Sequence, residues 1–313
     1  MQMSSAAPAD RRLSNSTLAH LLLLVVVAIW GATFVLVKDA LQDASPLLFN
    51  LIRMVLAFLA MVVLNYRHLR NLSRRAVVSG LVVGIFLSAG YQFQTAGLAR
   101  TTPAKSAFIT GLIVVFVPCF TIFRALRPAG THAPRWNAIL GTLFAFSGLM
   151  LLTTPSGTRL AEVFTTIGLG DLLTLACAIA FAAHLIALAH FAPNLPAAQI
   201  ATLQIGFAAL CMAVTLPFGG ALRLTFTPRL FIALIVTSLL ATAAAFTIQS
   251  WAQQYIPPTH TAVLLTLEPV FAYLTSLLFL HERLGPRSLT GGSLILVGIA
   301  IIEFLSPTPI PPA

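Results

Sequence analysis

Charged side chains are scarce in this sequence. Asp, Glu, Lys and Arg make up 8% of its 313 residues, whereas a soluble domain carries about 25%. A chain with so few charges cannot cover a water-facing surface, which excludes a soluble enzyme. The net charge is +10. We assign the positive residues to loops that set membrane topology and contact anionic lipid, and we therefore expect no nucleic-acid partner.

Cysteines are few as well. Cys119, Cys177 and Cys211 each lie inside an apolar run, so they form neither a disulfide framework nor a metal-ligand spacing. No nucleophile–base pair and no phosphate-binding loop stands out in the sequence. We therefore expect no metal, no cofactor and no enzymatic activity.

Long apolar runs are what the sequence has instead. A helix that crosses a bilayer needs about 20 mostly apolar residues, and ten such runs can be marked. They predict an all-α integral membrane protein with ten transmembrane helices. The runs are Leu18–Val37, Pro46–Asn65, Ala76–Leu98, Pro103–Phe123, Trp136–Thr153, Gly168–His190, Pro196–Pro217, Leu230–Gln253, Thr259–Leu280 and Ser288–Leu305.

The runs also repeat. A shift of 150 residues places Pro46 on Pro196 and Gly148 on Gly298, and a shift of 155 places Gln94 on Gln249. The pattern predicts two five-helix repeats, residues 18–155 and 165–306, between a cytosolic tail (1–17) and a disordered, Pro-rich tail (307–313). Because five is odd, the second repeat is inverted. Inverted repeats are typical of secondary transporters, whose site lies near the midplane.

Loop charges predict the orientation. In the first half, Lys and Arg concentrate on the side of the N-terminus, whereas in the second half they lie on the opposite side. We follow the first half, because early helices usually dominate insertion. We expect both termini in the cytoplasm and the chain in the inner (plasma) membrane.

Three segments resemble the EamA family of the drug/metabolite transporter superfamily. They are Ala-Ile-Trp-Gly-Ala-Thr-Phe at 28–34, the stretch from Thr102 to Pro118, and Leu-Glu-Pro-Val-Phe-Ala at 267–272, which is followed by Glu282. The resemblance covers roughly residues 18–306. It implies ten helices in two inverted halves, and export or exchange of metabolites such as amino acids.

Ionisable residues inside an apolar run are candidates for function, because they are costly in lipid. Arg53 is either an anchor for a substrate carboxylate or a structural contact to backbone carbonyls. Glu268 either binds substrate or a proton, or caps backbone groups freed where Pro269 kinks the helix. His184 either relays protons or bonds a neighbouring helix, and Asp171 is expected to cap its helix. We place Arg53, Pro118, Asp171 and Pro269 in structural or gating roles.

Aromatic and amide residues form a second candidate set. Trp30 and Phe34 share one helix face, as do Tyr91 and Thr95. If such faces converge, they form an apolar pocket with few polar groups. The predicted substrate-binding residues are Trp30, Phe34, Tyr91, Thr95, His184, Phe246, Gln249 and Glu268.

These observations favour a secondary transporter of small organic metabolites, such as amino acids or related amphipathic compounds, working by alternating access. A nucleotide-sugar or phosphorylated-sugar exchanger is the alternative, but it calls for several buried cations. A membrane-embedded enzyme or a receptor fits less well, since paired carboxylates, His clusters and long extensions are missing from the sequence. We expect a monomer whose partners are its substrate and the bilayer.

Overall fold

The computed structural model describes residues 14–128, 136–153, 167–256, 258–265, 267–281 and 285–305. Both predicted tails and Glu282 lie largely or wholly outside this part of the chain. The described secondary structure is helical throughout. The α-helices are α1 (Asn15–Ala40), α2 (Pro46–Leu69), α3 (Arg74–Leu98), α4 (Pro103–Thr110), α5 (Ile113–Thr121), α6 (Trp136–Thr153), α7 (Leu169–Phe191), α8 (Ala197–Thr215), α9 (Pro228–Ser238), α10 (Ala245–Ala252), α11 (Pro258–Leu265), α12 (Glu268–Phe279) and α13 (Pro286–Phe304).

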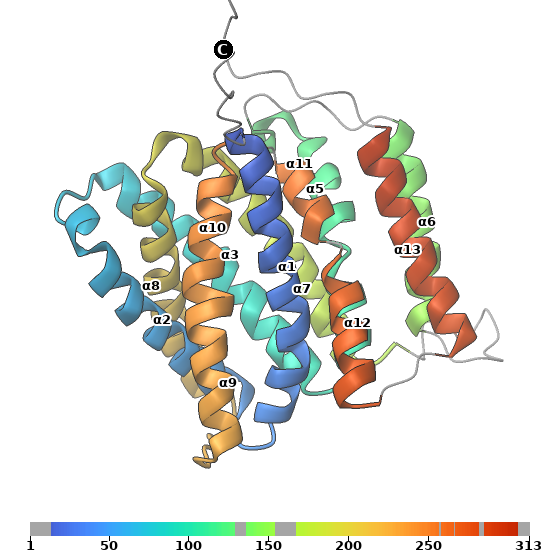
Figure 1. Ribbon diagram of the computed structural model, residues 1–313, viewed down its shortest axis with the longest axis horizontal. Helices are drawn as coiled ribbons and strands as arrows, with labels where there is room; N and C mark the ends of the chain where they lie inside the picture. The colour runs from blue at the N-terminus through green and yellow to red at the C-terminus, as the bar shows by residue number, and fades with distance from the viewer. Residues whose placement is uncertain are drawn as a thin grey trace, which may run out of the picture.

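These helices group into ten segments, because α4 with α5, α9 with α10, and α11 with α12 each continue one another. Seven segments within the described residues are long and apolar enough to cross a membrane. The chain enters α1 and leaves α13 at the same end of the bundle, as an even number of crossings requires (Figure 1). The structure thus confirms a helical membrane protein of ten segments.

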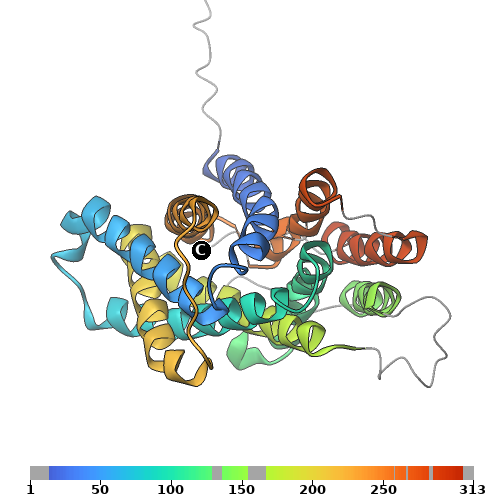
Figure 2. The same ribbon diagram turned by 90° about the horizontal axis from the view of Figure 1, so that it is seen from below.

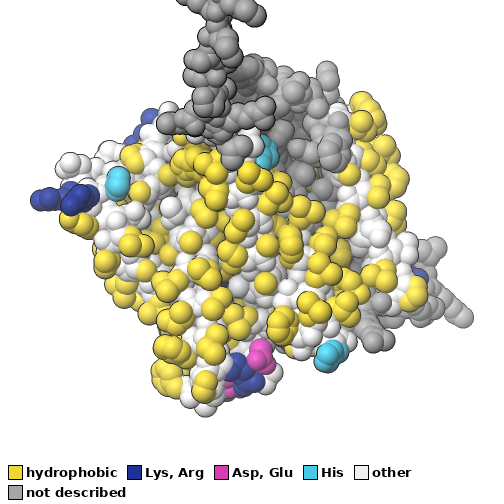
Figure 3. All heavy atoms as spheres, viewed as in Figure 1, with side chains coloured by type: hydrophobic (Ala, Val, Ile, Leu, Met, Phe, Trp, Pro, Cys, Tyr) yellow, Lys and Arg dark blue, Asp and Glu magenta, His cyan; other side chains and the backbone are white. Residues whose placement is uncertain are grey.

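The exterior of the bundle is apolar. Figure 3 shows hydrophobic side chains over the viewed face, with charged side chains gathered at its two ends. Residues such as Leu64, Phe231 and Leu278 are more than 60% exposed on the helices. Lipid tails, rather than water, match such a surface.

Two predicted continuous helices are broken, and they break at repeat-related positions. The segment from Pro103 stops at Thr110 and resumes at Ile113, and the segment from Pro258 stops at Leu265 and resumes at Glu268. The hydrogen bonds match as well. The amide of Leu112 donates to the Ile109 carbonyl, and the amide of Leu267 donates to the Leu264 carbonyl, both at 3.1 Å.

Pro269 lies directly after the expected interruption of its helix, but it is not required for a break of this kind. Its partner at a shift of 155 is Val114, which donates its amide to the Gly111 carbonyl. The same interruption therefore forms with and without proline. Irregular backbone at membrane depth is tolerated where protein or a cavity surrounds it, and both breaks lie beside the cavity described below.

A third departure from a regular helix lies between α9 and α10. Residues Leu239–Ala244 form a π-helix, which we label η5. A π turn widens the helix and leaves carbonyl groups without their usual i+4 donors. The Thr242 hydroxyl donates to the Thr237 carbonyl at 2.8 Å, five residues back. The Ala241 carbonyl in η5 accepts hydrogen bonds from side chains of α1 and α2, as described below.

Glycines let the repeats approach each other closely. A Cβ atom at Gly148 in α6 would collide with the Gly291 carbonyl oxygen, and one at Gly298 in α13 would collide with the Gly141 carbonyl oxygen. These four glycines are repeat-related in pairs, so the α6–α13 contact is itself two-fold symmetric. Figures 1 and 2 show these two helices side by side at one edge of the bundle. Small residues commonly permit such contacts in membranes.

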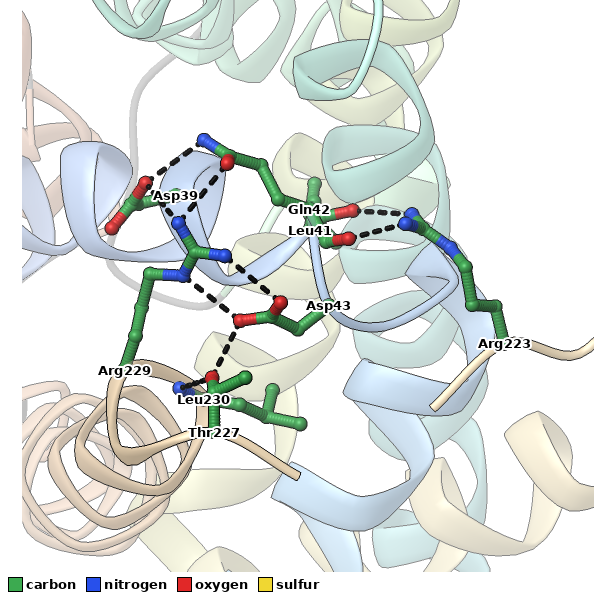
Figure 4. A network of polar contacts seen from close by, with 8 residues as sticks. All are labelled: Asp39, Leu41, Gln42, Asp43, Arg223, Thr227, Arg229 and Leu230. Atoms are coloured by element: carbon green, nitrogen blue, oxygen red, sulfur yellow. Dashed lines mark hydrogen bonds and ion pairs between the residues drawn. The ribbon is translucent and has the colours of Figure 1, made fainter. Parts of the chain in front are cut away.

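A charged cluster joins the repeats at one end of the molecule (Figure 4). We define the Asp43–Arg229 cluster as Asp39, Gln42, Asp43, Thr227 and Arg229. Arg229 grips Asp43 with two hydrogen bonds of 2.8 Å, and the Thr227 hydroxyl donates to the same carboxylate at 2.6 Å. The hydrogen bond from Arg229, followed by that from Thr227, lowers the pKa of Asp43 below its ordinary value. The cluster fastens the α1–α2 turn to the loop before α9.

Candidate functional site

One cavity lies inside the bundle, between the two repeats. It encloses about 640 Å³ of non-protein space, including the part open to solvent. Helices α1, α2, α3, α7 and α10 contribute side chains to its wall, and so do the ends of α4, α5, α11 and α12 at the two helix breaks. The lining residues are Trp30, Thr33, Phe34, Val37, Arg53, Tyr91, Gln94, Thr95, Leu98, Thr110, Ile113, Phe181, His184, Leu185, Phe246, Gln249, Leu265 and Glu268.

All eight residues that we predicted to bind substrate line this cavity. They come from α1, α3, α7, α10 and α12 and would be scattered in any other packing. Arg53, which we placed in a structural or gating role, lines it as well. Pro118, Asp171 and Pro269 are not part of the wall. Binding of a substrate by the eight residues stays a prediction.

The repeat relation runs through the cavity. At a shift of 155, Tyr91 pairs with Phe246, Gln94 with Gln249, and Ile113 with Glu268; both members of each pair line the wall. At a shift of 150, Phe34 pairs with His184 in the same way. The cavity therefore lies across the pseudo-two-fold axis, where inverted-repeat transporters place their sites. Glu268 and His184 make its chemistry asymmetric.

Aromatic rings form a connected cluster in the wall. Trp30 and Phe246 have ring centroids 5.3 Å apart, and Tyr91 lies 5.4 Å from Phe181 and 6.0 Å from Phe246. The His184 ring contacts both phenylalanines, edge to face. Such contacts hold each ring in place. We call Trp30, Tyr91, Phe181, His184 and Phe246 the ring cluster.

Arg53 is buried, and its guanidinium is held by protein groups. Its Nε donates to the Thr242 hydroxyl at 2.7 Å, and its Nη2 donates to the Tyr91 hydroxyl at 3.1 Å and to the Ala241 carbonyl at 3.3 Å. The guanidinium carbon also lies 4.4 Å from the centre of the Tyr91 ring. A cation over an aromatic face is stabilised by the quadrupole of the ring. Thr242 and Ala241 thus join Arg53 to η5, and Tyr91 joins it to α3.

The π-helix also anchors α1. The indole Nε1 of Trp30 donates to the Ala241 carbonyl at 2.7 Å, the same oxygen that accepts from Arg53. The freed carbonyl of η5 thus joins α1 and α2 to the second repeat. No sequence signal for a π-helix exists in this stretch of small residues, so this link could not be foreseen.

His184 has a side-chain partner away from the ring cluster. Its Nε2 lies 2.8 Å from the Gln204 Oε1, and the Gln204 amide donates to the Ser250 hydroxyl at 3.0 Å. With the Gln204 oxygen as acceptor, Nε2 carries the imidazole proton. The arrangement matches the second of the two roles that we weighed, a hydrogen bond to a neighbouring helix.

Glu268 starts α12 and is 7% exposed, and α1 lies directly against it. A Cβ atom at Gly31 would lie 2.7 Å from the Glu268 carbonyl oxygen and 2.6 Å from the Phe271 Cβ. Within the described residues, no hydrogen bond or ion pair engages the Glu268 carboxylate. Nor does the Oε1 of Gln249, itself 2% exposed, find a partner there. The cavity thus holds two oxygen groups that protein does not satisfy.

The other predicted residues, Asp171, Pro118 and Pro269, lie outside the cavity wall and within or at the start of helices. Asp171 lies in the first turn of α7, where its Oδ2 accepts from the Gly168 amide at 3.1 Å and from Lys105 at 2.8 Å. This is the capping role that we expected, with an ion pair to α4 in addition. Pro118 is buried inside α5, and Pro269 lies in the first turn of α12.

Several wall residues were not predicted. Gln94 could have been found from the repeat, because it pairs with the predicted Gln249. Phe181 pairs with Gly31, so the repeat points to no ring there, and only packing places it in the cluster. Across the described residues, no group of three His, Cys, Asp or Glu could hold a metal ion.

A bundle of apolar, partly broken helices around a cavity on a pseudo-two-fold axis defines a membrane transporter of the inverted-repeat class. The profile of the EamA-like transporter family matches residues 17–154 and again 168–304. The chain belongs to this family, and through it to the drug/metabolite transporter superfamily.

Individual relatives agree with this assignment. The chain is 31% identical over 287 residues to an uncharacterized transporter of Archaeoglobus fulgidus, covering 91% of this chain and 85% of that protein. It is 24% identical over 235 residues to a WAT1-related protein of Arabidopsis thaliana, covering 72% and 67%. A solved protein structure with 18% identity matches the fold over 94% of this chain, with a TM-score of 0.65.

Proposed function

We propose that this protein carries small organic metabolites, such as amino acids or related amphipathic compounds, across the inner membrane by alternating access. It acts as an exporter or exchanger, and both termini are cytoplasmic. The observation that carries the proposal is the cavity on the repeat axis, which is lined by all eight predicted binding residues. A rocking motion of the two inverted repeats would expose it to each side in turn.

The chemistry of the wall supports a small organic substrate. Rings and aliphatic side chains supply most of the surface, and a few polar groups give direction, as is usual for small-molecule sites. A phosphorylated or nucleotide sugar would require several free cations. Arg53 is the one Lys or Arg in the described wall, and its Nε and Nη2 already serve Thr242, Tyr91 and Ala241.

Counterflow into proteoliposomes tests this function. Purified protein is first screened by thermal shift against a metabolite library, and each stabilising compound is then tested for accumulation against an unlabelled internal pool. We expect at least one hit, and we expect Phe246→Ala to reduce its counterflow. Phe231→Ala serves as the control, because Phe231 is 65% exposed on the outer surface of α9. A library without any compound that exchanges would contradict the proposal.

A further inference from the structure

The unsatisfied groups in the cavity have a common character. When it is ionised, the Glu268 carboxylate only accepts hydrogen bonds, and the Gln249 Oε1 is also an acceptor. Buried polar atoms are nearly always paired in folded proteins. An acceptor that stays unpaired in an otherwise packed wall points to a ligand that donates.

Most N–H donors of the charged and ring side chains in the described wall are engaged by protein groups. The guanidinium of Arg53 is held on three sides by Thr242, Tyr91 and Ala241 and stacks on the Tyr91 ring. The indole N–H of Trp30 is used by the Ala241 carbonyl, and His184 Nε2 is used by Gln204. Apart from the Arg53 Nη1, which has no partner among the described residues, these donors would have to leave protein acceptors to bind a carboxylate or phosphate ligand.

The repeat relation strengthens this reading. The counterpart of Glu268 is Ile113, and the counterpart of Gln249 is Gln94, which is only half-buried. The acceptors therefore concentrate on the second repeat, at α10 and the start of α12. A helix start favours a carboxylate through the helix dipole, and Gly31 lets α1 press against that turn.

The remaining wall suits the organic part of an amine. The ring cluster offers aromatic faces and edges, and ring faces attract cations. A primary ammonium has three N–H donors and one positive charge. It can serve the carboxylate and the amide oxygen together, and it compensates the buried charge of Glu268.

We propose that the substrate of this transporter carries a primary ammonium group, which binds between the Glu268 carboxylate and the Gln249 Oε1 with its organic body against the ring cluster. The proposal rests on the transport function above and names the chemical class of its substrate. A carboxylate elsewhere on the substrate is not needed for binding.

A matched ligand series tests the proposal. The compounds are 2-phenylethylamine, phenylalanine, 3-phenylpropionate, 2-phenylethanol and trimethyl(2-phenylethyl)ammonium, which share one ring and differ in charge and N–H donors. Dissociation constants are measured on the purified full-length protein. We expect the two primary amines to bind roughly ten- to a hundredfold more tightly than the alcohol, because a charged hydrogen bond is gained. The trimethyl compound, without N–H donors, should bind more weakly than the primary amine.

Two variants locate the ammonium. Glu268→Gln keeps the shape of the side chain and should bring the affinity for 2-phenylethylamine down to that for the alcohol. Gln94→Leu alters the amide on the other repeat and should keep the preference for the amine over the alcohol, whereas Gln249→Leu should weaken that preference. Each variant is compared with the wild type by gel filtration and thermal unfolding, and the ligand series on the wild type decides even if Glu268→Gln does not fold.

The outcomes separate this proposal from the general function. If the carboxylate or the alcohol binds as tightly as the amines, or if Glu268→Gln keeps the preference for the amine, the ammonium assignment is wrong. Counterflow of non-amine metabolites from the library would then leave the transport function standing. If neither the series nor the library yields counterflow, both proposals fail.

Discussion

The two repeats build the same framework but equip it differently. Both contribute a broken helix, with the interruption at Leu112 in the first and at Leu267 in the second, and both contribute glycines to the α6–α13 contact. In the cavity, however, the first repeat supplies Ile113 where the second supplies Glu268. Duplication preserves backbone geometry because packing depends on it, whereas single side chains in the wall are free to set the chemistry.

The two ends of the molecule differ in the same way. At one end, Asp43 and Arg229 form a bidentate ion pair between the repeats (Figure 4). At the other end, the repeat-related partners of these residues are Pro193 and Arg74, and Gln199 instead donates to the His68 carbonyl at 2.8 Å. An ion pair closes one end, and neutral hydrogen bonds close the other. The contacts between the repeats therefore differ in chemistry at the two ends.

Substitutions at the close helix contacts of the framework should cause the largest loss of stability. Gly31→Leu would force a side chain into the backbone of α12, 2.7 Å from the Glu268 carbonyl oxygen. We expect the free energy of unfolding to fall by on the order of 3 kcal/mol. The α12 backbone cannot move aside as the end of a flexible side chain could. Thermal unfolding in detergent measures the loss. Gly285→Ala is the control, since nothing lies within 4 Å of its Cβ position, and an equal loss there would contradict the packing argument.

The second-largest loss of stability is expected when the buried arginine of the first repeat, Arg53, is replaced. Arg53→Met removes the donors that serve Thr242, Tyr91 and Ala241. The buried Tyr91 hydroxyl loses its partner, whereas Ala241 keeps the hydrogen bond from Trp30. We expect a loss of roughly 2 kcal/mol in unfolding free energy. Arg67→Met, an exposed arginine of the same helix, should change it little. If Arg53→Met unfolds at the wild-type temperature, the guanidinium is not a structural link to η5.

Substitution in the Asp43–Arg229 cluster should change the stability least, because Arg229 is about one-third exposed and solvent screens the ion pair. The pKa of Asp43 is lowered in the folded state, chiefly by the hydrogen bond from Arg229. The stabilisation is therefore complete above the ordinary aspartate pKa and is lost as the pH falls through the lowered value. We expect Asp43→Asn to lower the thermal unfolding temperature at neutral pH, and the difference from the wild type to shrink in acid. A difference that stays constant with pH would contradict this.

Sequence patterns were sufficient for the class of protein and for half of the wall, nine of its 18 residues. Apolar runs reflect the energetic cost of polar groups in lipid, which acts on each segment separately. The repeat and helix faces brought Trp30, Tyr91, Gln249 and Glu268 together, because side chains four apart share a face whatever the helix packs against. Local rules of this kind need no knowledge of the tertiary structure.

The helix breaks and the π-helix followed no such rule. The sequence predicted an unbroken helix from Pro103 to Phe123 and a proline kink at Pro269. The first repeat nevertheless breaks at the same place, between Thr110 and Ile113, although Val114 stands at the position of the proline. Backbone that leaves the α-helix in a membrane must find its hydrogen bonds in neighbouring helices, as the Ala241 carbonyl does with Trp30 and Arg53.

By itself, the sequence determined that this protein lies in a membrane, that it contains two related halves, and which residues are too costly to bury without a purpose. Only the tertiary structure decided that Arg53 is held by protein groups, while Glu268 finds no partner among the residues that the structure describes. The reason is physical: burial of a charge follows from the segment that carries it, whereas its compensation depends on groups from distant helices.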